Sequence, residues 1–89
     1  MENIKDFKDL FLWQRAMDLV VEVYDLVKKL LKEELFALSD HIRCAVISIP
    51  SNIAEGQGRN SSKEFIHFLS IAKGSKAELE TQLITLCKN

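Results

Sequence analysis

The sequence predicts an all-α protein, an antiparallel up-and-down helical bundle. Three long segments carry apolar residues at alternating spacings of three and four, which is the repeat of one helix face. No segment shows the apolar and polar alternation of a strand, and there is no internal repeat or low-complexity linker. At 89 residues, with 47% apolar and 28% charged residues, the chain is expected to form one domain over residues 1–89.

The first helix is expected over residues 9–31, where two neighbouring apolar stripes run along the segment. Together they are wider than the seam of a two-stranded coiled coil, so this helix should contact at least two neighbours. The first stripe is Leu10, Trp13, Met17, Val20, Tyr24, Val27 and Leu31, and the second is Leu12, Ala16, Leu19, Val23, Leu26 and Leu30.

The second helix is expected over residues 34–55 and the third over residues 61–88. Gly56 is typical of a glycine that caps a helix C-terminus, and a short loop over 57–60 follows. Ser61 and Glu64 have the spacing of a capping box. The inward faces are Leu35, Leu38, Ile42, Ala45, Val46, Ile49 and Ile53, then Phe65, Phe68, Leu69, Ala72, Leu79, Leu83 and Leu86.

The chain ends at Asn89, directly after the third expected helix. Three helices with such broad apolar faces would leave a groove where the fourth helix of a four-helix bundle lies. An exposed apolar strip of that kind usually marks an interaction site. We therefore expect either self-association or a truncated chain that lacks the fourth helix.

The segment SIPSNIAEGQGR, residues 48–59, places a proline inside an otherwise buried helix, at a cost of roughly 3 kcal/mol. Ser48, Ser51, Asn52 and Glu55 share one face of that helix by their spacing. They can be a polar recognition strip, or Ser48 and Asn52 can satisfy carbonyls freed by Pro50 while Glu55 holds the following loop. The structural interpretation is favoured, because Pro50 leaves a backbone carbonyl without its hydrogen-bond donor and these side chains could supply one.

Gly56 and Gly58 could suggest a phosphate-binding loop. They follow a helix, with no strand before them and no Gly-Lys-Ser/Thr ending, so that signal is very weak. We interpret the glycines as part of a shape motif. Arg59 and Lys63 lie just beyond the turn and would extend a recognition strip.

No metal, cofactor or catalytic site is expected. His41 and Cys44 are one turn apart with Asp40 beside them, but a structural zinc site needs four ligands and only His67 and Cys87 remain. The two cysteines are interpreted as small core residues, and His67 as a half-buried packing residue. Since no catalytic arrangement stands out, the sequence predicts a non-enzyme.

The expected location is the cytoplasm. Two cysteines are few for a secreted domain of this size, and the acidic N-terminus has no signal-peptide core. No apolar run approaches the ~18 residues that span a bilayer, so no membrane association is expected.

Several residues together carry a family resemblance: Phe7, Leu10, Trp13 and Gln14, the whole segment 48–59, Phe65 to Leu69, Gly74-Ser75, and Glu78-Leu79-Glu80. In these the chain resembles the small four-helix-bundle proteins encoded in intervening sequences of 23S ribosomal RNA genes. Lys76 departs from that pattern, since the family usually has an apolar residue there.

The resemblance implies a helical bundle without a defined activity that assembles into a ring, typically a homopentamer. It extends to the accessory variability determinant of diversity-generating retroelements, which binds a reverse transcriptase and nucleic acid. The sequence thus supports a structural or adaptor module that forms a homo-oligomer. The alternative is a nucleic-acid-binding module for RNA or DNA, with phosphate contacts from Arg43, Arg59, Lys63 and Lys73.

Overall fold

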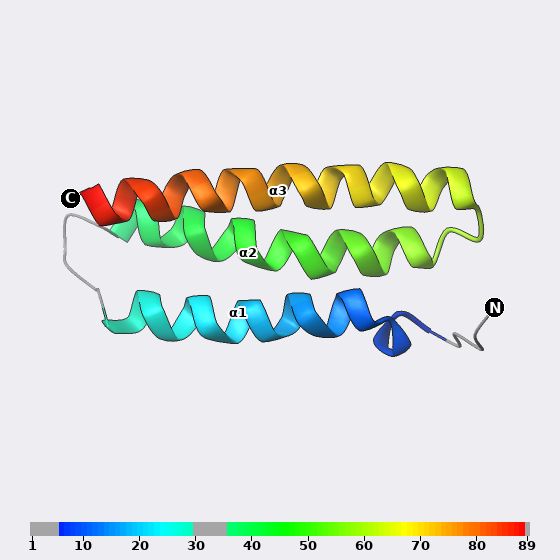
Figure 1. Cartoon of the computed structure of the whole chain (residues 1–89), viewed down its shortest axis with the longest axis horizontal. Coiled ribbons are helices and arrows are strands. Elements are labelled where there is room, and N and C mark those ends of the chain that lie inside the picture. Colours follow the sequence, from blue (N-terminus) through cyan, green and yellow to red (C-terminus); the bar gives the residue numbers. More distant parts are fainter. Residues whose placement is uncertain (1–5, 30–35, 89) are drawn as a thin grey trace.

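The fold, seen in a computed structural model that describes residues 6–29 and 36–88, is three helices side by side (Figure 1). They are α1 (Phe11–Lys29), α2 (Phe36–Gln57) and α3 (Ser62–Lys88), and the short 3-10 helix η1 (Phe7–Asp9) precedes them. The described residues contain no strand, so the all-α prediction is confirmed. Each helix runs antiparallel to the next, and α2 packs against both of the others.

The N-terminal segment forms a turn that precedes α1. Asp6 caps η1, because its Oδ1 accepts a hydrogen bond from the Lys8 N–H at 2.8 Å, and Leu10 is extended. The predicted start of the first helix at Asp9 is therefore wrong: Asp9 closes the 3-10 turn, and α1 begins at Phe11. Its predicted last residues, 30 and 31, lie outside the described residues, as do residues 34 and 35 at the start of the second helix.

The hydrophobic core centres on α2. Ile42, Val46 and Ile53 are almost completely buried, and burial of one such side chain contributes about 1.5–3 kcal/mol. The other two helices supply the facing residues, which are Ala16, Val23 and Val27 from α1 and Ala72 and Leu79 from α3. The apolar repeat of α2 thus predicted the core correctly.

The second stripe of α1 is partly buried and partly exposed. Val23 is buried against α2, as is Val27 of the first stripe, whereas Leu12 is 52% exposed and Leu26 is 41% exposed. The expectation that α1 touches two neighbours holds only in part within this chain, because the Cα atoms of α1 and α3 nowhere approach within 8 Å in the described residues. Part of the second stripe thus remains exposed among the described residues.

Gly56 does not cap α2, and that prediction is wrong. The helix continues to Gln57, and Gly56 is buried within it. A Cβ atom on Gly56 would lie 2.7 Å from the Phe68 Cβ and 3.0 Å from the Phe65 Cδ1. Glycine is needed at this position so that α2 and α3 can approach closely.

The turn between α2 and α3 is set by other residues. The left-handed backbone conformation belongs to Asn60, with φ of 59°, and asparagine tolerates this region better than most residues. Ser61 Oγ accepts a hydrogen bond from the Glu64 N–H at 3.3 Å, so the predicted cap of the third helix forms at Ser61. The helix itself begins at Ser62, one residue later than expected.

Two further predictions about packing are wrong. Cys44 and Cys87 are free and exposed rather than core residues. His67 is exposed too, although its ring lies edge-on to Phe68 at 5.4 Å between centroids. Each lies on a helix face that points away from the α2 core. In the part of the chain that the structure describes, no helix is both long and apolar enough to span a membrane.

Candidate functional site

The polar strip predicted on α2 is divided between different environments. Ser48 and Asn52 are half-buried, while Ser51 and Glu55 are exposed. Pro50 is buried, and α2 runs through it from Phe36 to Gln57 as one helix. The four polar residues therefore do not act as a single surface.

Ser48 and Asn52 join α2 to α3. The Ser48 and Ser75 hydroxyl oxygens lie 2.8 Å apart, and Ser75 is buried on α3. Asn52 Nδ2 donates to the Ser48 carbonyl oxygen at 2.8 Å and to the Ser48 Oγ at 3.0 Å. Pro50 removes the N–H donor of the Val46 carbonyl, whereas Asn52 donates to the Ser48 carbonyl, which Pro50 does not free. This bond is therefore not the predicted compensation for the proline. The network cross-links the two helices, and its member Ser75 was not among the site residues predicted from the sequence.

Ser51 faces the other side of α2, toward α1. It borders a largely apolar cavity of about 320 Å³ whose walls include Trp13, Met17, Ile47 and Pro50. The rings of Phe7 and Trp13 meet edge to face there, with 5.3 Å between their centroids. Pro50 thus contributes its ring to a hollow between α1 and α2, beside the bend that brings η1 against α2.

Glu55 and Arg59 form an ion pair across the end of α2, with 2.7 Å between Oε2 and Nη2. The Arg59 guanidinium also lies over the Phe68 ring, 5.0 Å from its centroid. Both side chains are about half exposed, and an exposed pair of this kind contributes at most about 1 kcal/mol. The pair bridges the segment that contains Gly56 and Gly58, so the contact between Glu55 and Arg59 stabilises the turn after α2.

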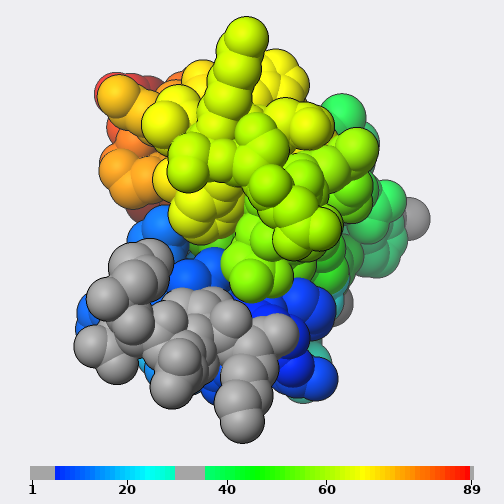
Figure 2. Space-filling model, turned by 90° about the vertical axis from the view of Figure 1, so that its right-hand side faces the viewer, coloured from blue at the N-terminus to red at the C-terminus, as the bar shows by residue number. Residues whose placement is uncertain are grey.

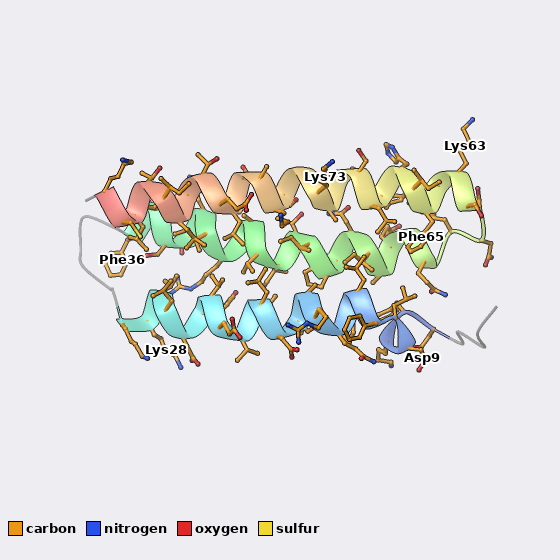
Figure 3. The ribbon with its side chains drawn as sticks, in the orientation of Figure 1. Asp9, Lys28, Phe36, Lys63, Phe65 and Lys73 are labelled. Atoms are coloured by element: carbon orange, nitrogen blue, oxygen red, sulfur yellow. The ribbon has the colours of Figure 1, made fainter. Side chains whose placement is uncertain are left out.

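The four basic residues proposed as phosphate contacts do not form one patch. Arg43 pairs with Asp40 at 3.3 Å and lies over the Tyr24 ring, and about 21 Å of helix separates it from Gln57 at the end of α2. Lys63 extends away from the start of α3, and Lys73 lies further along the same helix (Figure 3).

A groove lies between α1 and α3, with α2 as its floor. Figure 2 looks along the helices, with α1 below and α2 and α3 above it. The groove holds a cavity of about 260 Å³ lined by Leu12 of α1, by Ile49 and Ile53 of α2, and by Leu69, Ala72, Lys73 and Lys76 of α3. Its lining is almost entirely apolar apart from the two lysines.

In residues 6–29 and 36–88, no group of three or more histidine, cysteine, aspartate or glutamate side chains is placed to hold a metal ion. The fold and the site together define a small all-α protein with a polar link between α2 and α3 and an open apolar groove between α1 and α3.

The family model of the 23S rRNA-intervening sequence protein matches residues 8–89. The chain therefore belongs to this family, as its motif residues indicate. Comparison with the curated proteins and with the solved structures gives no match.

Proposed function

We propose that this chain is a non-enzymatic helical-bundle protein that self-assembles into a homo-oligomer and acts as a structural or adaptor module. The observation that carries the proposal is the open groove between α1 and α3. Both walls and the floor of this groove are built by regular helices, so it has the shape that receives another helix.

The energetic case rests on apolar side chains that the single chain leaves in water. Leu12 and Leu26 retain about half of their accessible surface, and Phe11, Ile66 and Ile84 retain more. Complete burial of a leucine contributes about 1.5–3 kcal/mol, so covering the groove would favour association. Exposed apolar surface marks interaction sites in soluble proteins when it forms a contiguous patch.

The first test is the absolute mass in solution, measured by light scattering after gel filtration at two concentrations. We expect a defined multiple of 10.2 kDa, and the family resemblance makes five copies one of the multiples to look for. The variant Leu12→Asp should dissociate the oligomer, because it places a charge against the apolar floor. The matched control is Val21→Asp, since Val21 is 59% exposed and lies on the opposite side of α1. A monodisperse monomer at micromolar concentration would contradict the proposal.

Nucleic-acid binding through Arg43, Arg59, Lys63 and Lys73 has less support. Arg43 is paired with Asp40 of its own helix, Arg59 in the turn after α2 is paired with Glu55, and the formal net charge of the chain is -1. Titration with a fluorescent RNA at low salt tests it, because each phosphate contact adds roughly 0.7–0.9 to the salt slope. Tight binding that weakens steeply with salt would shift the functional assignment to this alternative.

A further inference from the structure

The N-terminal segment and the segment over residues 48–59 meet at the cavity between α1 and α2, which we call the α1–α2 cavity. Its volume is about 320 Å³. It lies on a different side of α2 from the groove, because Pro50 lines the cavity whereas Ile49 lines the groove. Its walls include Phe7, Trp13 and Met17 from the N-terminal part of the chain, and Ile47, Pro50 and Ala54 from α2.

Small side chains on α2 leave this cavity open. Pro50, Ser51 and Ala54 line it opposite the larger Trp13 and Met17 of α1. The Trp13 and Met17 side chains are half-buried, so part of each is accessible from outside the chain. The cavity therefore offers apolar surface that the helix packing itself does not cover.

The aromatic wall of the α1–α2 cavity is held in place by the N-terminal turn. Gln14 Nε2 donates a hydrogen bond to the Lys8 carbonyl oxygen at 2.9 Å, which ties η1 to the start of α1. The Phe7 ring then meets the Trp13 ring edge to face, with 5.3 Å between their centroids. A wall that is already formed lowers the entropic cost of binding, and ligand sites are usually preformed in this way.

The lining selects an uncharged ligand. Among the described residues that line the α1–α2 cavity none is charged, and Ser51 carries the only hydroxyl group. A charged group in the cavity would lose hydration without gaining an ion-pair partner. Glu55 and Arg59 line a neighbouring hollow, but they are paired with each other at 2.7 Å.

The lining also favours flat aromatic rings. Aromatic rings attract one another edge to face, and a methionine sulfur packs favourably against a ring. Trp13 and Met17 can make these contacts on one side of a bound ring, with Pro50 on the other. Since a cavity of about 150 Å³ holds benzene, about 320 Å³ has space for two fused rings.

We propose that the α1–α2 cavity is a binding site for a small, uncharged aromatic molecule of two fused rings that carries one hydroxyl group. The rings lie between Trp13 and Pro50, and the hydroxyl group forms a hydrogen bond with Ser51, which is exposed at the rim. The site goes beyond the proposed function, because it lies apart from the groove that carries self-assembly.

Nuclear magnetic resonance tests the site with 2-naphthol as the probe. Trp13 is the only tryptophan of the chain and Met17 is one of two methionines, so their indole N–H and methyl signals are easily assigned. Both signals should shift and saturate as 2-naphthol is added. The charged 2-naphthoate and the saturated decahydro-2-naphthol are matched ligand controls, and both should bind more weakly. Absence of a saturable shift, or equal binding of all three compounds, overturns the proposal.

Two variants locate the ligand. Ala54→Leu should fill part of the cavity and weaken 2-naphthol binding at least about tenfold. Its control is Ala37→Leu, the same change at an exposed position of α2, which should leave binding unchanged. Ser51→Ala should weaken binding about fivefold through loss of one hydrogen bond, and it tests the site even if Ala54→Leu does not fold. Binding that Ser51→Ala leaves unchanged overturns the proposed pose.

The outcomes separate this site from the proposed function. Saturable binding of 2-naphthol to a monomer supports the site and contradicts self-assembly. A defined oligomer that does not bind 2-naphthol keeps self-assembly and overturns the site. A Trp13 indole signal that shifts with protein concentration in the absence of ligand assigns the cavity to a contact between subunits, and this too overturns the site.

Discussion

Gly56 offers the sharpest test of how α2 and α3 pack. In Gly56→Ala the new methyl group would lie 2.7 Å from the Phe68 Cβ and 3.0 Å from the Phe65 Cδ1. The Phe68 Cβ is attached directly to the backbone, so a rotamer change does not move it away. Figure 3 shows Phe65 beside this end of α2. The two helices must therefore separate by several tenths of an ångström, and the core between them loosens.

Gly74→Ala is the matched control, because Gly74 lies within α3 with open space around it. Replacing an exposed helical glycine by alanine should raise the free energy of unfolding by about 0.5–1 kcal/mol. In Gly56→Ala the gain from replacing a helical glycine is no larger, and overpacking lowers the free energy of unfolding by about 1–3 kcal/mol. The difference between the two variants thus measures the overpacking cost itself.

Thermal unfolding followed by circular dichroism, at one fixed protein concentration, measures that difference. For a domain of this size 1 kcal/mol corresponds to about 4–8 °C, so an overpacking cost of at least about 1 kcal/mol should make Gly56→Ala melt at least about 4 °C below Gly74→Ala. Urea denaturation provides the free energies. Equal stabilisation by both alanines would refute the close approach at Gly56, and would show that α2 and α3 have space at their turn.

The other predictions concern the polar link and the turn. Ser75→Ala should lower the free energy of unfolding by about 1 kcal/mol, because it removes the hydrogen bond to Ser48. In a double-mutant cycle, Ser48→Ala should cost less in that background than alone, and additive effects would argue against the bond. Asn60→Gly should leave stability nearly unchanged, whereas Asn60→Val should lower it by about 1–2 kcal/mol, since φ is 59° there. Equal stability of those two variants in urea would contradict the left-handed turn.

The sequence by itself determined the helices and the buried face of α2. Apolar spacing of three and four is a local property, so it predicted Ile42, Val46 and Ile53 as core and placed Ser61 at a helix start. The family also followed from sequence, because the segment over residues 48–59 is long and unusual.

Residue type and apolar spacing along the chain gave wrong predictions for residues whose role depends on a second helix. Gly56 looks like a cap because glycine is the usual residue just after the end of a helix. The close contact with Phe68 of α3 instead requires a glycine inside the helix. The left-handed residue is Asn60 instead. Cys44 and Cys87 were expected in the core, yet both are free and exposed in the structure.

In the candidate site, too, some features follow from the sequence and others only from the packing of the helices. The sequence identified Ser48 and Asn52 as polar residues near a helix proline, while only the packing of α2 on α3 brought Ser75 within 2.8 Å of Ser48. The sequence predicted an apolar surplus on α1, but the arrangement of three helices decided where it lies. Side-chain periodicity fixes which face of a helix is apolar. Which neighbour covers that face depends on contacts between residues far apart in the chain, and those exist only once the helices have packed.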